Sequence, residues 1–205
     1  MPFLSALVCA AALAASQGVI ADRLVAVVAG QPIMASDLRA ARTLDLIRGA
    51  AELDDAALID RLVVRELMRM EVERFSTTVA DADRAAAVRT DAEARAARAG
   101  EAGLAALGLS PGRLLAWLED DVRIEHYMRQ RFDAAAQPSD DEALIWFQIH
   151  EREYLRDGRP RPFAAVREDV RARLAAERRQ SLVDDWIAGL RRRAIIVLAP
   201  AADPP

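Results

Sequence analysis

Apolar side chains recur at helical spacing through most of this chain, and the segments between them carry residues that start and stop helices. Asp54 precedes one apolar run, Ser110-Pro111 begins another, and Ser139 with Glu142 forms a capping box. Gly100 and Gly108 are typical of helix ends. Ser36 is predicted to cap a first helix, and Asp81 to cap an Ala/Arg helix that ends at Gly100. A short helix is predicted to end at Gly108. The other predicted helices cover residues 55–75, 111–132, 140–154 and 163–193.

Two β-branched stretches lie near the ends of the chain, in "RLVAVVAGQPIMASDL" and "AIIVLAP". Residues 24–28 and 33–35 predict a hairpin that turns at Ala29-Gly30. Residues 195–198 are too few to form a stable strand alone, so we expect them to pair with 24–28. The predicted fold is mainly α, with a long C-terminal helix packed back on the other helices and a small sheet joining both chain ends.

The segment "ALIWFQI" is apolar nearly all round a helix, since Leu144, Ile145, Trp146, Phe147 and Ile149 point in different directions at about 100° per residue. A surface helix normally buries one stripe. We expect either that this helix lies between two layers of the protein, or that one side faces a groove for apolar segments of another chain.

Composition narrows the possible functions. The 205 residues are 53% apolar and 29% charged with only 5% aromatic, which favours one helical domain. All 28 basic residues are arginine, so chemistry that needs a lysine amine is excluded. The net charge of −4 provides no overall basic field for a nucleic acid.

Residues 1–21 carry no charged side chain and include a short apolar run, which predicts a secretory signal cut before Asp22. A buried N-terminal helix or a mis-assigned start codon is the alternative. Cys9, the single cysteine, would leave with the signal. The expected location is the periplasm, with no stable membrane insertion after cleavage.

Two motifs resemble catalytic signatures but lack the necessary chemistry. "GLSPG" places Pro111 after Ser110, and proline has no N–H to serve as an oxyanion donor. "HEREY" has Tyr154 where a zinc protease has its second histidine. We expect His126 and His150 to be surface or interhelical residues, and the acidic runs near 119–121 and 140–142 to be solvated or at helix starts. No catalytic residue, metal ligand or cofactor site is predicted.

The segments, in their order, resemble the N-terminal chaperone domain of the SurA family of periplasmic folding factors. The resemblance rests on "RLVAVVAGQPIMASDL", "LIDRLVVRELMRMEVERF", "ALGLSPGRLLAWLEDDVRIEHYMRQRF", "PSDDEALIWFQIHEREY" and the segment from "RPFAAVREDV" to "RRRAIIVL". It covers about residues 22–199. The family usually has Asn where Ala29 stands.

Family members often carry parvulin-type prolyl isomerase domains before the last long helix. Here the resemblance implies N-terminal helices over 22–154, a loop over 155–162 too short for such a domain, and a C-terminal helix and strand over 163–199. We expect the tail over 200–205 to be disordered, as chain ends often are. An annotation as an isomerase would then be inherited by name only.

The resemblance and the export signal predict an ATP-independent periplasmic holdase for unfolded exported proteins, including outer-membrane protein precursors. The alternatives are an envelope scaffold serving one dedicated partner and, less favoured, a prolyl isomerase with an unrecognised site. The sequence leaves open whether the protein is a monomer or a dimer that swaps its last helix. The residues predicted to bind peptide are Trp146, Phe147, Trp117, Tyr127, Met128 and Tyr154.

Overall fold

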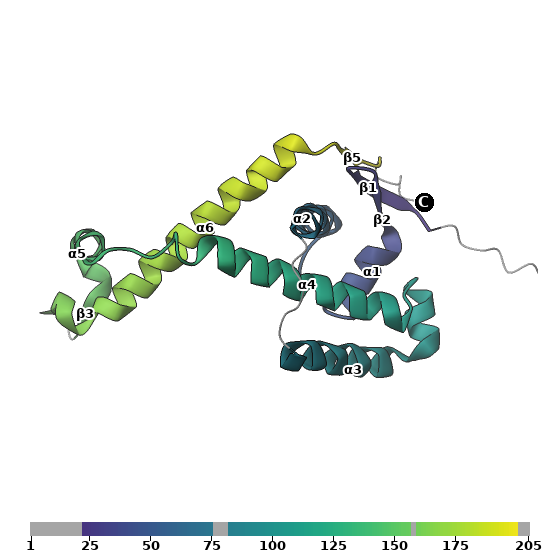
Figure 1. The fold of residues 1–205 in the computed structure, drawn as a ribbon, viewed down its shortest axis with the longest axis horizontal. Coiled ribbons are helices and arrows are strands. Elements are labelled where there is room, and N and C mark those ends of the chain that lie inside the picture. Colours follow the sequence, from purple (N-terminus) through teal and green to yellow (C-terminus); the bar gives the residue numbers. More distant parts are fainter. Residues whose placement is uncertain (1–21, 76–81, 157–158, 201–205) are drawn as a thin grey trace, which may run out of the picture.

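The computed structural model describes residues 22–75, 82–156 and 159–200, and Figure 1 shows that they are mainly helical. The predicted signal peptide with Cys9, the predicted cap Asp81 and residues 201–205 of the predicted tail lie outside this part of the chain. The helices are α1 (Ala35–Thr43), α2 (Asp55–Glu73), α3 (Ala82–Ala106), α4 (Pro111–Phe132), α5 (Asp140–Ile149) and α6 (Arg167–Arg193). The strands are β1 (Leu24–Val28), β2 (Gln31–Met34), β3 (Leu155–Arg156), β4 (Arg159–Pro160) and β5 (Ile196–Leu198).

A three-stranded antiparallel sheet ties the two ends of the chain together, as predicted. β1 lies in the centre, with β2 on one side and β5 on the other. In the β1–β5 pair, Val28 lies opposite Ile196 and Ala26 lies opposite Leu198. The predicted hairpin turn is also present: Ala29 and Gly30 join β1 to β2 with φ angles of 47° and 89°.

The turn at Ala29 predicts a simple stabilising substitution. An alanine at positive φ is strained by its Cβ, whereas asparagine adopts this conformation readily. Ala29→Asn should therefore raise the free energy of unfolding by about 0.5–1 kcal/mol, measured by urea denaturation. As a control, Ala94→Asn on the exposed side of α3, before the break at Gly100, should lower it slightly, because asparagine is a poorer helix former than alanine. An unchanged or lowered stability of Ala29→Asn would contradict this description of the turn.

The start of α1 differs from the prediction. The helix begins at Ala35, so Ser36 is its second residue and not its cap. The Asp22 carboxylate accepts hydrogen bonds from the backbone N–H of Ser36, at 3.1 Å, and from its hydroxyl group. Asp37 accepts from the Met34 N–H at 2.7 Å. Two carboxylates thus satisfy groups at the helix start that Ser36 was expected to satisfy.

The other helix boundaries follow the local signals closely, with two exceptions. Asp54, Ser110 and Ser139 cap α2, α4 and α5, and Gly100 breaks α3 with a φ of 70°. The helix predicted over 140–154 ends at Ile149 and continues as a 3₁₀ turn, Glu151–Tyr154. The helix predicted from Phe163 begins at Arg167, because a separate 3₁₀ turn, Phe163–Ala165, precedes it and brings Phe163 and Val166 to the same small core.

Most of the protein forms a core lobe made of the sheet, α1 to α4 and the C-terminal half of α6. Figure 1 shows α2 between α4 and α6, with α3 along the opposite side of α4. Within this lobe Trp186 joins α6 to α4, since its ring lies 5.7 Å from that of Tyr127 and 5.6 Å from that of Phe132. The side chains that are almost fully enclosed here include Val28, Leu58, Val63 and Leu114.

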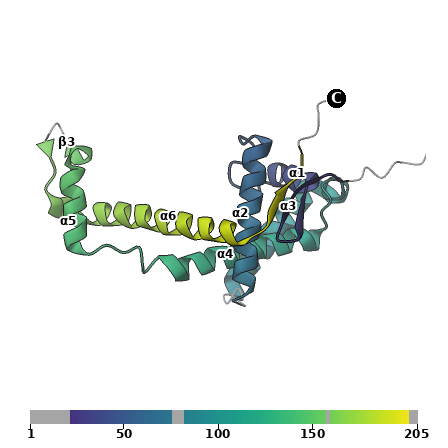
Figure 2. The same ribbon diagram turned by 90° about the horizontal axis from the view of Figure 1, so that it is seen from above.

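The N-terminal half of α6 leaves the core lobe and carries a second, smaller unit, which we call the arm (residues 140–174). Figures 1 and 2 place α5 at the far end of α6, across its axis and away from the sheet. The predicted loop over 155–162 contains a short antiparallel hairpin, with Leu155 opposite Pro160 and Arg156 opposite Arg159. The Arg161 N–H donates to the Tyr154 carbonyl at 3.0 Å and closes this hairpin onto the 3₁₀ turn.

Candidate apolar binding surface

The arm has its own small hydrophobic core, and three of the predicted peptide-binding residues lie inside it. Trp146, Phe147 and Tyr154 are each less than a tenth exposed. They pack against a row of α6 residues and the turn before it, formed by Val166, Val170 and Leu174 with Phe163 at the margin. The Trp146 indole N–H donates to Glu177 at 3.1 Å, and His150 stacks on the indole ring with centroids 3.9 Å apart. These side chains hold α5 on α6 and are not displayed on the surface.

The opposite side of α5 faces solvent and carries three apolar side chains beside the polar Asp141 and Gln148. Ile145 is 58% exposed and Ile149 is 75% exposed, with Leu144 beside them at 37%. We call these three side chains the arm face. Because α5 packs on α6 through one side only, the expectation that two layers enclose it is wrong. The exposed apolar positions are therefore Leu144, Ile145 and Ile149, rather than Trp146 and Phe147.

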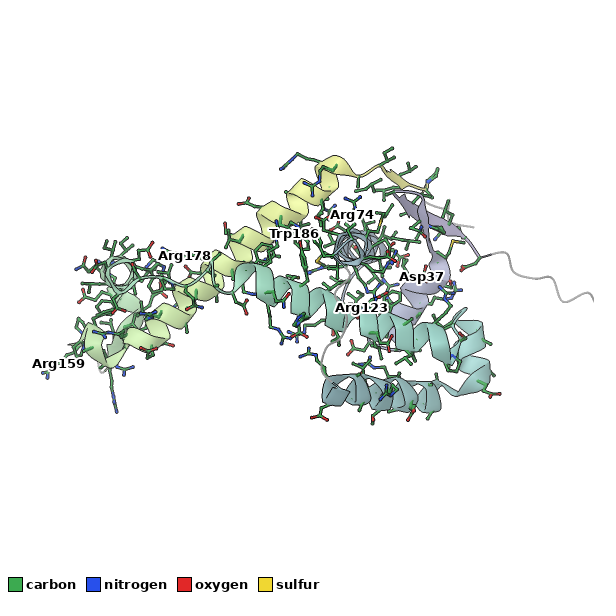
Figure 3. All side chains as sticks on the ribbon, in the orientation of Figure 1. Asp37, Arg74, Arg123, Arg159, Arg178 and Trp186 are labelled. Atoms are coloured by element: carbon green, nitrogen blue, oxygen red, sulfur yellow. The ribbon has the colours of Figure 1, made fainter. Side chains whose placement is uncertain are left out.

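Ion pairs on the flanks of α5 hold the helix in this orientation. Arg178 of α6 donates to Glu142 at 2.8 Å, and Arg171 of α6 pairs with Asp140. Figure 3 shows Arg178 where α6 passes α5, and Arg159 at the outer end of the arm. These pairs join the start of α5 to α6 and lie beside the arm face.

The Glu142 carboxylate makes the arm sensitive to acid. Hydrogen bonds from Arg178, and then from the N–H and hydroxyl of Ser139, lower the pKa of Glu142 to about 2 from an ordinary value of 4.5. A pKa depressed in the folded state contributes stability that is present above pH 4.5 and is lost as the pH falls toward 2. This contribution acts on the contact between α5 and α6.

We therefore expect Glu142→Gln to remove the part of the protein's stability that is lost when the Glu142 carboxylate is protonated. At pH 7 the variant should have a lower Tm than the parent protein, and the difference should shrink as the pH falls from 4.5 to 2. Thermal melts followed by circular dichroism at several pH values test this. Glu151→Gln, also exposed on the arm but without an ion pair to any described residue, is the matched control. A Tm difference that stays constant over this range would show that Glu142 does not act through its charge.

The other predicted site residues belong to the core lobe, so the structure does not bring the six together. Tyr127 is buried, and its hydroxyl accepts from Arg131 at 3.0 Å. Met128 is half-buried against the main core. Trp117 is also half-buried, with the guanidinium carbon of Arg65 3.8 Å from the centre of its ring. Tyr127 and Met128 support the packing of α4, and Trp117 lines a cavity.

That cavity, of about 240 Å³, lies between β2, α2 and α4. Its arginines are already engaged, since Arg65 pairs with Asp121 at 2.7 Å and Arg69 pairs with Glu66 at 2.7 Å. Burial raises the pKa of Asp37 and of Asp120, which also line it. The lining of this cavity mixes apolar and charged side chains, and the ion pairs of Arg65 and Arg69 are internal to the protein.

The two motifs that resemble catalytic signatures have structural roles. The Ser110 hydroxyl accepts from the Arg113 N–H at 3.2 Å and caps α4. His150 ends α5, with Nδ1 2.8 Å from the Trp146 carbonyl oxygen. In the described part of the chain no group of three or more His, Cys, Asp or Glu residues is placed to hold a metal ion. Over the same residues, no helix is both long enough and apolar enough to cross a bilayer.

Comparison with the models of known protein families, with curated proteins and with solved structures finds no match to this chain.

Proposed function

We propose that this protein is an ATP-independent holdase of the periplasm that binds extended apolar segments of unfolded exported proteins. The observation that carries the proposal is the arm face. Ile145 and Ile149 are more than half exposed, although Trp146 and Phe147 between them in sequence are buried. A helix that needed only to complete a small domain would be expected to carry polar residues at these positions.

The chemistry of the arm face suits weak binding to many sequences. Branched aliphatic side chains gain affinity from burial at about 25 cal/mol per Å² and demand no particular hydrogen-bond partner. In the part of the chain that the structure describes, the arm face has no second layer above it, so a client segment can lie on it without displacing any described element. Release follows when the client buries the same segments in its own fold.

The SurA-like order of segments and the predicted export signal support the same proposal. The eight residues over 155–162 leave no room for a parvulin domain of roughly a hundred residues, so the proposed activity is binding without isomerisation. Outer-membrane β-barrel precursors are suitable clients because their strands alternate apolar and polar side chains, and these strands are exposed before insertion.

Light scattering tests the proposal directly. A urea-unfolded outer-membrane β-barrel protein is diluted into buffer with and without this protein, in the absence of ATP. We expect aggregation to be suppressed near an equimolar ratio, for several unrelated clients. Unchanged aggregation of all of them would reject the holdase, and a pull-down that returned one stoichiometric partner would then support the dedicated scaffold.

A further inference from the structure

β5 is an edge strand whose outer side has no strand partner among the described residues. The Ala29 N–H donates to the Ile195 carbonyl at 2.8 Å, and the Ala199 N–H donates to the Val25 carbonyl at 3.0 Å. In an antiparallel ladder the bonded positions alternate, so residues 195, 197 and 199 face β1. The N–H and C=O groups of Ile196 and Leu198 therefore point away from the sheet, available to a further strand.

The side chains of this edge are also unusually apolar. Ile195 is 77% exposed, Val197 is 55% exposed and Leu198 is 63% exposed. Sheet edges in natural proteins are commonly blocked by proline, bulges or charged side chains. β2, at the opposite edge, contains Pro32, which has no N–H to donate. β5 contains no such block before Pro200, so it is the better template for strand addition.

Cations lie at both ends of this edge. Arg192 and Arg193 end α6 just before β5, and Arg23 precedes β1 at the opposite end of the pair. All three are exposed, and within the described residues none of them forms an ion pair. Two acids near them in sequence or packing are already engaged, because Asp22 accepts from Ser36 and Glu71 pairs with Arg74. A complementary strand would carry carboxylates beside its apolar residues.

We propose that the open edge of β5 binds an extended, acidic peptide segment with alternating apolar side chains by adding it to the sheet as a fourth strand. The segment would exchange main-chain hydrogen bonds with Ile196 and Leu198 and place its carboxylates near Arg192, Arg193 or Arg23. The proposal rests on the proposed function in one respect: the segment is supplied by an unfolded client.

This second site would also raise the affinity of the holdase. β5 follows one end of α6 and the arm face lies near the other end, and a helix of 27 residues is about 40 Å long. A client segment of roughly 12 extended residues could reach from one site to the other. Two weak contacts with one chain then reinforce each other, because the second forms within the complex.

Leu198→Pro and Leu198→Ala separate the backbone contribution from that of the side chain. Both remove the leucine, but only proline removes the N–H that points to the open edge, and it leaves the hydrogen bonds to β1 in place. The probe is a fluorescein-labelled peptide in which valine and threonine alternate between pairs of aspartates, and binding to the purified protein is followed by fluorescence anisotropy. We expect Leu198→Pro to bind about tenfold more weakly than Leu198→Ala, the loss expected for one unsatisfied hydrogen bond.

A second test leaves the protein unaltered, so it does not depend on how a variant folds. Two versions of the same peptide are N-methylated at alternate peptide bonds. Methylation of the N–H groups that face β5 should abolish binding, because it removes the donors of the main-chain hydrogen bonds. Methylation of the N–H groups that face away from β5 should leave binding unchanged. Equal binding of all these peptides, or equal binding by the two Leu198 variants, would overturn the proposal.

Binding to anionic phosphatidylglycerol vesicles without peptide binding would assign the surface to a membrane, and a dimer abolished by Leu198→Pro would assign it to a second copy of this chain.

The peptide-binding assay tests strand addition at β5, and the light-scattering assay tests the holdase, so the two proposals can fail separately. If aggregation is suppressed but the peptide does not bind, strand addition is rejected and the arm face stands. If neither occurs, the proposed function fails as well.

Discussion

Replacing Ile145 and Ile149 together with glutamine should weaken client binding on the order of 100-fold, because two aliphatic side chains that a client buries contribute about 1.5 kcal/mol or more each. In the light-scattering assay this would appear as loss of suppression near equimolar ratio. Both positions are more than half exposed in the free protein, so the free energy of unfolding should change by less than about 0.5 kcal/mol.

A matched control separates the arm face from a general change in surface polarity. Ala102→Gln with Ala106→Gln adds the same two amides at exposed positions of α3, four residues apart as in α5. This control should suppress aggregation like the parent protein. Loss of suppression in both double variants, or in neither, would contradict the assignment of client binding to the arm face.

Trp186→Ala should be the most damaging single substitution for stability. The indole fills the angle between α6 and α4, beside α2, as Figure 3 shows, and it contacts both Tyr127 and Phe132. Truncation of a buried tryptophan typically lowers the free energy of unfolding by about 3–5 kcal/mol through lost apolar burial and the cavity left behind. Because Trp186 joins the helix that carries the arm to the core lobe, this loss should appear in the main urea transition.

Trp186→Phe is the control for this prediction. Phenylalanine keeps aromatic contact with α4 and removes an indole N–H that has no hydrogen-bond partner in the described part of the chain. We expect it to cost clearly less than the alanine variant, within about 1.5 kcal/mol of the parent. Equal losses for the two variants, or a loss below 1 kcal/mol for alanine, would show that Trp186 does not hold α6 on the core lobe.

Local signals in the sequence predict much of this fold. The caps at Asp54, Ser110 and Ser139 and the break at Gly100 act within a few residues, so they can be identified before any tertiary contact is known. The pairing of the two chain ends is a longer-range prediction. It succeeds because residues 195–198 are too few to be stable without a partner strand.

The binding surface could not be read correctly from the same signals. "ALIWFQI" identifies a helix that is apolar all round, but which side is buried depends on where α6 lies. Trp146 and Phe147 were the predicted contacts, although large aromatic rings also gain most from burial in a small core. That preference would have indicated that the smaller Ile145 and Ile149 were the exposed pair. The role of Asp22 at the start of α1 was equally hidden, since it lies 14 residues from Ser36.

The central claim is that clients bind the arm face, and site-specific photo-crosslinking tests it most directly. A benzoylphenylalanine is placed at position 149 in one variant and at position 105 on the exposed side of α3 in another. Each is irradiated with the same unfolded outer-membrane protein. We predict covalent adducts with the client from position 149 and none from position 105. Adducts from position 105 alone, or from neither position while aggregation is still suppressed, would contradict the claim.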